Sequence, residues 1–203
     1  MTEDEARNWI RARYDVSRET CLAQFADMLR EAAAHQNLVA PSTLHQIWSR
    51  HFVDSAQLLD HVGAASGIWL DIGSGAGLPG IVLAILRDAP VELVEPRKLR
   101  TAFLEQAVAT LGLRNARVLT AKVERSHGHA AIVTARAVGS LDTLFRIAAH
   151  RTDSSTIWVL PKGRNAYSEV EDAKLWWQGS FHVEPSVTAP DSLIVIAKEV
   201  RPR

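Results

Sequence analysis

The first 62 residues carry hydrophobic side chains at the three- and four-residue spacing of amphipathic helices. Ser17 is placed to cap one such run and Ser42 to cap a second. The hydrophobic faces consist of Cys21, Leu22, Phe25, Met28, Leu29 and Ala32, and of Leu44, Ile47, Trp48, Phe52, Leu58 and Leu59. Residues 37–41, Asn-Leu-Val-Ala-Pro, interrupt the pattern between them. We therefore expect residues 1–62 to form an N-terminal helical cap.

A different pattern begins at Gly67, where short apolar runs alternate with amphipathic segments. It predicts strands at residues 68–72, 91–95, 116–121, 131–135 and 156–160, and helices at residues 79–87, 97–111, 141–150 and 166–177. Strands that alternate with helices are typical of a parallel sheet covered on both faces. Residues 181–187 and 192–200 have no helix between them and predict a closing antiparallel pair. Residues 63–203 are therefore expected to form an α/β domain.

Composition excludes several classes of protein. The chain has 203 residues, of which 47% are hydrophobic and 23% charged, as is usual for a globular protein with a full core. The single Cys21 cannot form an internal disulfide, and the histidines show no metal-ligand spacing. The acidic start does not resemble a signal peptide, and no apolar run reaches the roughly 18 residues that span a bilayer. We expect a cytoplasmic protein without a metal and without a membrane anchor.

Charge is balanced overall but unevenly distributed. Residues 97–164 carry 12 basic and 4 acidic side chains, a net charge of +8. Such a stretch is often only a solvated face, but it is also the electrostatic footprint of a phosphate-rich partner. A nucleic acid is therefore a candidate partner.

Residues 69–80 carry the most specific chemical signal in the sequence. A buried strand ends at Asp71, and Pro79 suits the first turn of the helix that follows. Glycines stand at alternate positions between them: Gly73, Gly75 and Gly77. Alternate glycines let the backbone turn tightly and approach a ligand, because no Cβ intervenes. Glu95 ends the next strand, where its carboxylate can accept hydrogen bonds from both hydroxyls of a ribose. The loop predicts an adenosine-containing cofactor.

Two cofactors compete for this loop. The sequence from Gly75 also satisfies the dinucleotide fingerprint, with Glu95 at the expected distance, so a nicotinamide-dependent oxidoreductase is one candidate. S-adenosylmethionine is favoured because the glycines start directly after the strand and no second domain is left to bind a hydride acceptor. Asp71 can also meet the ammonium group of the methionine moiety. A tight turn without any ligand is a third interpretation, which the combination of Asp71, the glycines and Glu95 argues against.

Four segments together resemble one protein family. They are Arg-His-Phe-Val-Asp-Ser at residues 50–55, Asp-Ile-Gly-Ser-Gly-Ala-Gly-Leu-Pro-Gly at residues 71–80, Thr-Ala-Arg-Ala at residues 134–137 and Leu-Pro-Lys-Gly at residues 160–163. In this order and spacing they are similar to the small-subunit ribosomal RNA methyltransferase G family, also called glucose-inhibited division protein B. The resemblance runs from about Asn37 to the C-terminus. It implies a class I S-adenosylmethionine-dependent methyltransferase fold, with a seven-stranded, mostly parallel sheet, and methylation of guanine N7 in 16S rRNA.

The resemblance also implies roles for individual residues. Gly73 and Leu78 match cofactor-loop contacts, and Val123 with Glu124 matches the segment that meets the adenine. Arg136 matches an arginine at the methyl-transfer face and is the expected catalytic residue, in contact with the cofactor as well. The expected contacts to 16S rRNA, free or in the small ribosomal subunit, are Asn37, His51, Arg97, Lys98, Arg100 and Lys162. Asp54 and Ser55 match positions beside His51 on the helical side.

The chemistry implied by the family fits a site without a Ser-His-Asp or Cys-His arrangement. Guanine N7 carries an in-plane lone pair and no hydrogen, so its attack on a sulfonium methyl group needs no general base. Alignment of the two reactants is then the main contribution of the protein. Two departures from the family pattern, Leu99 and the alanines with His35 ahead of Asn37, keep open a cofactor-binding, RNA-contacting protein without transfer activity.

Overall fold

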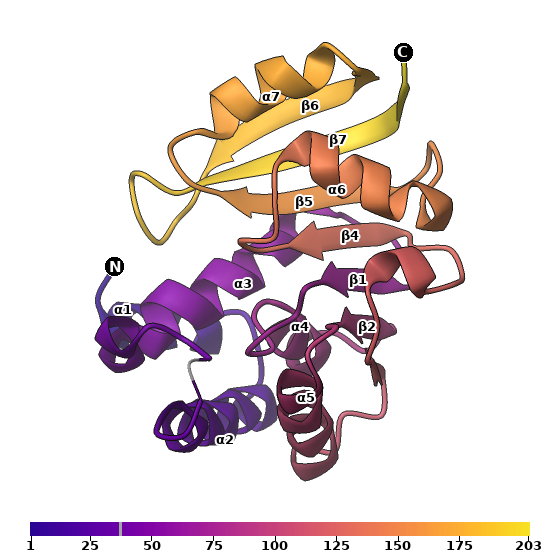
Figure 1. Cartoon of the computed structure of the whole chain (residues 1–203). Coiled ribbons are helices and arrows are strands. Elements are labelled where there is room, and N and C mark those ends of the chain that lie inside the picture. Colours follow the sequence, from indigo (N-terminus) through magenta and orange to yellow (C-terminus); the bar gives the residue numbers. More distant parts are fainter. Residues whose placement is uncertain (37) are drawn as a thin grey trace.

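The computed structural model describes residues 1–36 and 38–203 and contains one seven-stranded sheet in the order β3-β2-β1-β4-β5-β7-β6 (Figure 1). The strands are β1 (Trp69–Ile72), β2 (Val91–Val94), β3 (Ala116–Leu119), β4 (Ile132–Ala135), β5 (Ile157–Lys162), β6 (Trp177–Pro185) and β7 (Leu193–Pro202). The first five are parallel, whereas β7 runs antiparallel to both β5 and β6. The predicted parallel sheet and its closing antiparallel pair are therefore confirmed.

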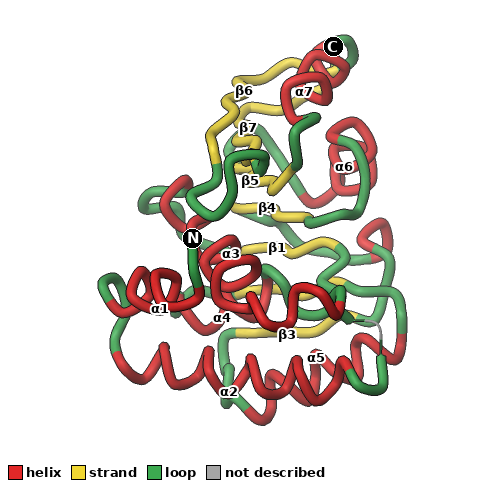
Figure 2. The backbone as a smooth tube through the Cα atoms, turned by 90° about the vertical axis from the view of Figure 1, so that its left-hand side faces the viewer, coloured by secondary structure: helices red, strands yellow, loops and turns green. Residues whose placement is uncertain are grey.

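Helices cover both faces of this sheet, which Figure 2 shows as a single layer. They are α1 (Glu3–Arg11), α2 (Val16–Ala33), α3 (Asp54–Ala56), α4 (Gly80–Leu86), α5 (Lys98–Thr110), α6 (Leu141–Ala148) and α7 (Ala166–Lys174). Because side chains alternate along a strand, Trp69 belongs to the buried cluster that includes residues of α1, α2, α4 and α5, whereas Leu70 belongs to the cluster that includes residues of α6 and α7. Among the described residues, no helix is long and apolar enough to cross a membrane.

The N-terminal helices share a core with the sheet. Phe25 and Phe52 stack at a centroid distance of 5.8 Å and belong to the same buried cluster as Trp69 and α4. Arg18 of α2 also donates hydrogen bonds of 2.8 Å to the Ile85 carbonyl and to Asp88. The division into residues 1–62 and 63–203 stays a prediction.

Two segments differ from the sequence-based expectation. Helix α2 is capped by Asp15, whose carboxylate accepts from the Arg18 amide at 2.9 Å, and not by Ser17; α1, inside the expected cap, starts at a capping box made by Thr2 and Glu5. The second expected helix is instead irregular: 3-10 turns at Pro41–Gln46 and Gln57–His61 flank a π-helical segment, Trp48–Val53, and the short α3. The amides of Trp48 and Ser49 donate to the Glu3 carboxylate at 3.0 and 2.8 Å, which removes them from a regular helical ladder.

The C-terminal helix also ends earlier than expected. Residues 166–177 were expected to be one helix, but α7 ends at Lys174 and Trp177 is the first residue of β6. Trp177 packs edge-on against Phe145 of α6 at 5.4 Å, while its neighbour Trp176 is exposed. The burial of Trp177 between sheet and α6 therefore overrides the helical pattern.

A buried ion pair fastens β2 to the chain that follows α6. Arg151, 1% exposed, donates to Glu92 at 2.7 Å, to Ser126 Oγ at 2.6 Å and to the Gly128 carbonyl. Glu92 also faces Arg117 at 3.9 Å, but Arg117 is exposed. Among the described residues, Arg151 is thus the only buried cation that pairs with Glu92.

We predict that Arg151→Leu lowers the free energy of unfolding by about 3 to 5 kcal/mol, because it leaves the buried Glu92 carboxylate with only the exposed Arg117, 3.9 Å away. Urea unfolding at pH 7 measures this change. The matched control, Arg117→Leu, removes an exposed partner of the same carboxylate and should cost less than about 1 kcal/mol. Equal losses in both variants would contradict the assignment.

Candidate functional site

A cavity of about 470 Å³ opens at the carboxyl ends of β1, β2 and β4. Its wall contains most of the residues that the sequence assigns to cofactor binding: Gly73, Gly75, Leu78, Glu95, Val123, Glu124 and Arg136. Parallel strands present their carboxyl ends at one edge of a sheet, which is where α/β folds bind ligands. The structure therefore brings these residues together from four separate segments of the chain.

The glycine loop follows β1 and bends back over its end. Gly75 has a φ of +55°, and its amide donates a 3.1 Å hydrogen bond to the Glu95 carboxylate. Gly77 lies outside the cavity wall; a Cβ there would lie 2.5 Å from Ile81 and 3.1 Å from Phe25. Gly77 thus lets the loop pack on the helices below it, whereas Gly73 and Gly75 face the cavity.

Asp71 lies beneath the loop and does not line the cavity. Its carboxylate accepts hydrogen bonds from Thr134 Oγ1 at 3.0 Å and from the Gly80 amide at 3.2 Å. Burial raises the pKa of Asp71 to about 6, although the hydrogen bonds oppose the rise. The observed contacts tie the end of β1 to β4 and to the first turn of α4. The expected contact between Asp71 and an ammonium group stays a prediction.

Glu95 connects the two loops that form the cavity floor. Besides the Gly75 amide it accepts the Arg97 amide at 2.9 Å, and it is 3% exposed. A carboxylate offers about four lone-pair directions, so two backbone contacts leave acceptor capacity for ribose hydroxyls. Glu95 is thereby held in place before any ligand arrives.

Basic residues follow Glu95 around the rim of the cavity. Arg97 and Arg100 line it, and Arg97 is exposed. Lys98 begins α5 and is exposed outside the lining. These three side chains lie where a polyanion approaching the cavity would meet them.

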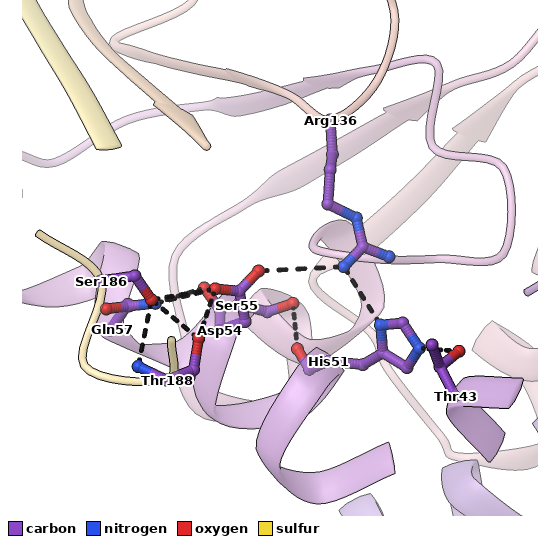
Figure 3. A network of polar contacts seen from close by, with 8 residues as sticks. All are labelled: Thr43, His51, Asp54, Ser55, Gln57, Arg136, Ser186 and Thr188. Carbon is purple, nitrogen blue, oxygen red and sulfur yellow. Dashed lines mark hydrogen bonds and ion pairs between the residues drawn. The ribbon is translucent and has the colours of Figure 1, made fainter. Parts of the chain in front are cut away.

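Arg136 follows β4 and meets a polar network from the N-terminal cap (Figure 3). Its Nη1 lies 3.2 Å from Nδ1 of His51 and 4.0 Å from Oδ2 of Asp54. Burial lowers the pKa of Arg136, while the Asp54 and Asp71 carboxylates act in the opposite direction. Since an arginine guanidinium stays charged in proteins, the site holds a fixed cation here.

His51 is a neutral hydrogen-bond acceptor in this network. Thr43 Oγ1 donates to the Ala40 carbonyl at 2.8 Å, so it accepts from Nε2–H of His51, 2.9 Å away. Nδ1 then has a free lone pair for Arg136. Burial, with the positive charges of Arg136 and Arg50, lowers the pKa of His51 to about 4. His51 lies outside the wall of the 470 Å³ cavity.

The Lys162 side chain makes intramolecular contacts and is largely buried. Its Nζ donates at 2.7 Å to both the Gly139 carbonyl and the Glu169 carboxylate, and its side chain is 9% exposed. Lys162 therefore fastens the loop after β4 to α7, and its expected role in RNA binding stays a prediction. Asn37, expected to contact RNA, lies outside the described residues.

Four residues of the polar network escaped the sequence analysis: Thr43, Gln57, Ser186 and Thr188. Asp54 was noted only as a neighbour of His51. Ser186 and Thr188 contact Asp54 across more than 130 residues of sequence, so no local pattern could have revealed them. In the described ranges, no group of three His, Cys, Asp or Glu side chains is arranged to hold a metal.

The sequence is similar to curated relatives over nearly its whole length. The family model described as rRNA small subunit methyltransferase G matches residues 18–191. The ribosomal RNA small subunit methyltransferase G of Zymomonas mobilis is 42% identical, covering 100% of this chain and 96% of that protein. The protein of the same name from Novosphingobium aromaticivorans is 43% identical, covering 98% of this chain and 89% of its own length.

Solved structures with low sequence identity share the fold. An S-adenosylmethionine-dependent methyltransferase from Aquifex aeolicus superposes with a TM-score of 0.61 at 13% identity, covering 86% of this chain and 98% of its own. A precorrin-6y C5,15-methyltransferase from Geobacter metallireducens gives 0.56 at 14% identity, covering 80% and 91%.

The comparisons confirm the predicted α/β class I methyltransferase fold and decide between the two candidate cofactors. S-adenosylmethionine, not a nicotinamide, is the cofactor that the family uses. With a family model over most of its length and relatives above 40% identity, the chain belongs to the rRNA small subunit methyltransferase G family.

Proposed function

We propose that this protein transfers a methyl group from S-adenosylmethionine to N7 of a specific guanine in 16S rRNA, as free RNA or in the small ribosomal subunit. The observation that carries the proposal is the position of Arg136. It lines the 470 Å³ cavity and also two cavities on its other side, of about 340 and 390 Å³. A cytoplasmic location is part of the proposal, because a ribosomal substrate lies there.

The 470 Å³ cavity suits S-adenosylmethionine in size and chemistry. Its volume falls in the usual range for cofactor pockets. Glu95 offers acceptors for ribose hydroxyls, the buried Val123 offers an apolar surface for adenine, and Gly73 and Gly75 keep the floor free of side chains. When bound, the cofactor supplies an electrophilic methyl group, which the N7 lone pair attacks while the carbon–sulfur bond breaks and its electron pair returns to sulfur.

The protein needs no general base for this reaction, and the structure supports that view. His51, which contacts Arg136, has a pKa lowered to about 4 and uses both ring nitrogens for Arg136 and Thr43. We propose that His51 orients Arg136 and that Arg136 orients the guanine. Holding nucleophile and methyl group in line contributes roughly 7 to 11 kcal/mol in well-aligned reactions.

RNA binding is proposed for the rim of the cavity. Arg97 and Lys98 are exposed and Arg100 half-buried, beside the cavity that holds the methyl donor. Basic side chains at such a rim attract the phosphate backbone without reading its sequence. The proposal includes Asn37, His51 and Lys162 as further RNA contacts, on the family resemblance alone.

The proposed reaction is tested by mapping N7-methylguanine in 16S rRNA, by borohydride and aniline cleavage, in cells with and without the gene. We expect one methylguanine to disappear in the deletion strain. Purified protein with S-adenosylmethionine should restore it on 16S rRNA or on small subunits from that strain. An unchanged pattern would leave a cofactor-binding, RNA-contacting protein without transfer activity.

We predict that Gly75→Val abolishes S-adenosylmethionine binding in calorimetry, because the branched side chain enters the cavity, where even a Cβ lies 3.3 Å from Arg100. Gly63→Val is the matched control. Gly63 has nearly the same φ, +56° against +55°, but no atom of the described residues would lie within 4 Å of a Cβ there. Both variants therefore carry similar backbone strain, and only the first should lose the cofactor. Normal affinity in Gly75→Val would contradict the cavity assignment.

We predict that Arg136→Ala lowers kcat for methyl transfer by at least about 100-fold, as loss of one positioned donor does in other enzymes. Cofactor affinity should change by no more than a few-fold, because other residues form most of the cavity wall. Single-turnover kinetics and calorimetry measure the two quantities. Arg114→Ala, at an exposed position, is the control. Wild-type turnover in Arg136→Ala would refute its role.

A further inference from the structure

Asp54 and Arg136 stand together between the cofactor cavity and the outer cavities. Arg136 lines all three cavities, whereas Asp54 lines only the two outer ones. In a base whose N7 lies at the cofactor cavity, the ring atoms nearest to N7 would therefore lie beside Arg136, and the more distant ring atoms would lie beside Asp54. The argument rests on the proposed function, since it concerns the guanine of that reaction.

One oxygen of Asp54 is fully used and the other is available. Oδ1 accepts from Gln57 Nε2 at 3.0 Å and lies 3.1 Å from Thr188 Oγ1 and 3.2 Å from Ser186 Oγ, two hydroxyls that are also hydrogen-bonded to each other at 2.7 Å (Figure 3). Among the described residues, nothing donates a hydrogen bond to Oδ2, which lies 4.0 Å from Arg136 Nη1. The Asp54 side chain is 17% exposed and lines both outer cavities, and the hydrogen bonds to Oδ1 fix the orientation of its carboxylate.

Arg136 is fixed in the same way and keeps donors available. Its Nη1 is bound by Nδ1 of His51, which Thr43 orients through the other ring nitrogen. Within the described ranges, Nη2 and Nε of Arg136 make no hydrogen bond. The site thus presents a guanidinium donor next to a carboxylate acceptor.

A donor at Arg136 followed by an acceptor at Asp54 complements the hydrogen-bonding groups of guanine and not those of adenine. On the purine ring, position 6 lies beside N7 and position 1 comes next. Guanine carries an acceptor, O6, followed by a donor, N1–H, whereas adenine carries a donor, N6, followed by an acceptor, N1. We propose that Arg136 binds O6 and that Oδ2 of Asp54 accepts from N1–H of the target guanine, which makes Asp54 a specificity-determining residue.

Charge supports the same assignment. Methylation at N7 moves a positive charge from the sulfonium onto the purine, and a neighbouring guanidinium opposes that movement. A carboxylate on N1–H offsets this repulsion, because it faces the ring that becomes cationic. Asp54 would therefore stabilise the transition state as well as select the base.

Asp54→Asn tests the proposal in an orientation that the structure fixes. Gln57 Nε2 can only donate to an oxygen, so the Asn oxygen stays at the position of Oδ1 and the amide NH₂ replaces Oδ2. We compare kcat/KM on 16S rRNA with guanine or with 2-aminopurine at the mapped position. In 2-aminopurine O6 is absent and N1 is an acceptor. The guanine-to-2-aminopurine ratio should fall at least about tenfold, as expected for a reversed base contact.

Asp60→Asn is the matched control, since it makes the same chemical change at an exposed position of the same segment. It should leave the ratio unchanged. If Asp54→Asn lowers both rates equally, Asp54 serves only to hold Arg136 and the proposal is overturned.

Wild-type protein provides a test that does not depend on a folded variant. It should methylate inosine, which keeps O6 and N1–H, far better than 2-aminopurine, and equal rates would overturn the proposal. If wild-type protein does not methylate guanine at all, the proposed function fails instead, so the two failures are distinguishable.

Discussion

The hydrogen bond between Arg136 and His51 joins the two parts of the chain that must cooperate at the site. Arg136 comes from the end of β4 and His51 from the N-terminal cap, 85 residues earlier. The bond depends on a neutral imidazole, and the burial that lowers the pKa of His51 to about 4 maintains that state over the physiological range. Without it, the arginine would be a long side chain with many rotamers at the mouth of the cofactor cavity.

The two halves of the site are built in different ways. The floor of the cofactor cavity is local: the glycine loop and Glu95 lie 20 residues apart and are joined by the Gly75 amide. The polar network, where we propose that the guanine binds, is assembled from three distant segments, around Thr43 to Gln57, at Arg136 and at residues 186–188. The cavity floor therefore depends on a short motif, while the polar network depends on the whole fold.

This difference explains how far the sequence could be used. The alternation of apolar runs predicted the five parallel strands, and the glycine loop with Glu95 predicted the cavity floor, because both depend on neighbouring residues. The irregular backbone of Trp48–Val53 could not be predicted, since Glu3 causes it from 45 residues away. The resemblance assigned Lys162 to RNA contact, and the sequence could not show that Glu169 and Gly139 bind it in the fold. Asp71 likewise turned out to contact Gly80 and Thr134 beneath the cavity.

The buried carboxyl group of Asp71, beneath the cofactor loop, makes the stability of the fold depend on pH. Its pKa is raised from 3.8 to about 6 in the folded chain, so the folded state binds the proton more tightly than the unfolded state. Folding is thus opposed as the pH rises from about 4 to 6, by an amount on the order of 3 kcal/mol that persists at neutral pH. This cost falls on the carboxyl group whose hydrogen bonds with Thr134 and the Gly80 amide join the end of β1 to β4 and to α4.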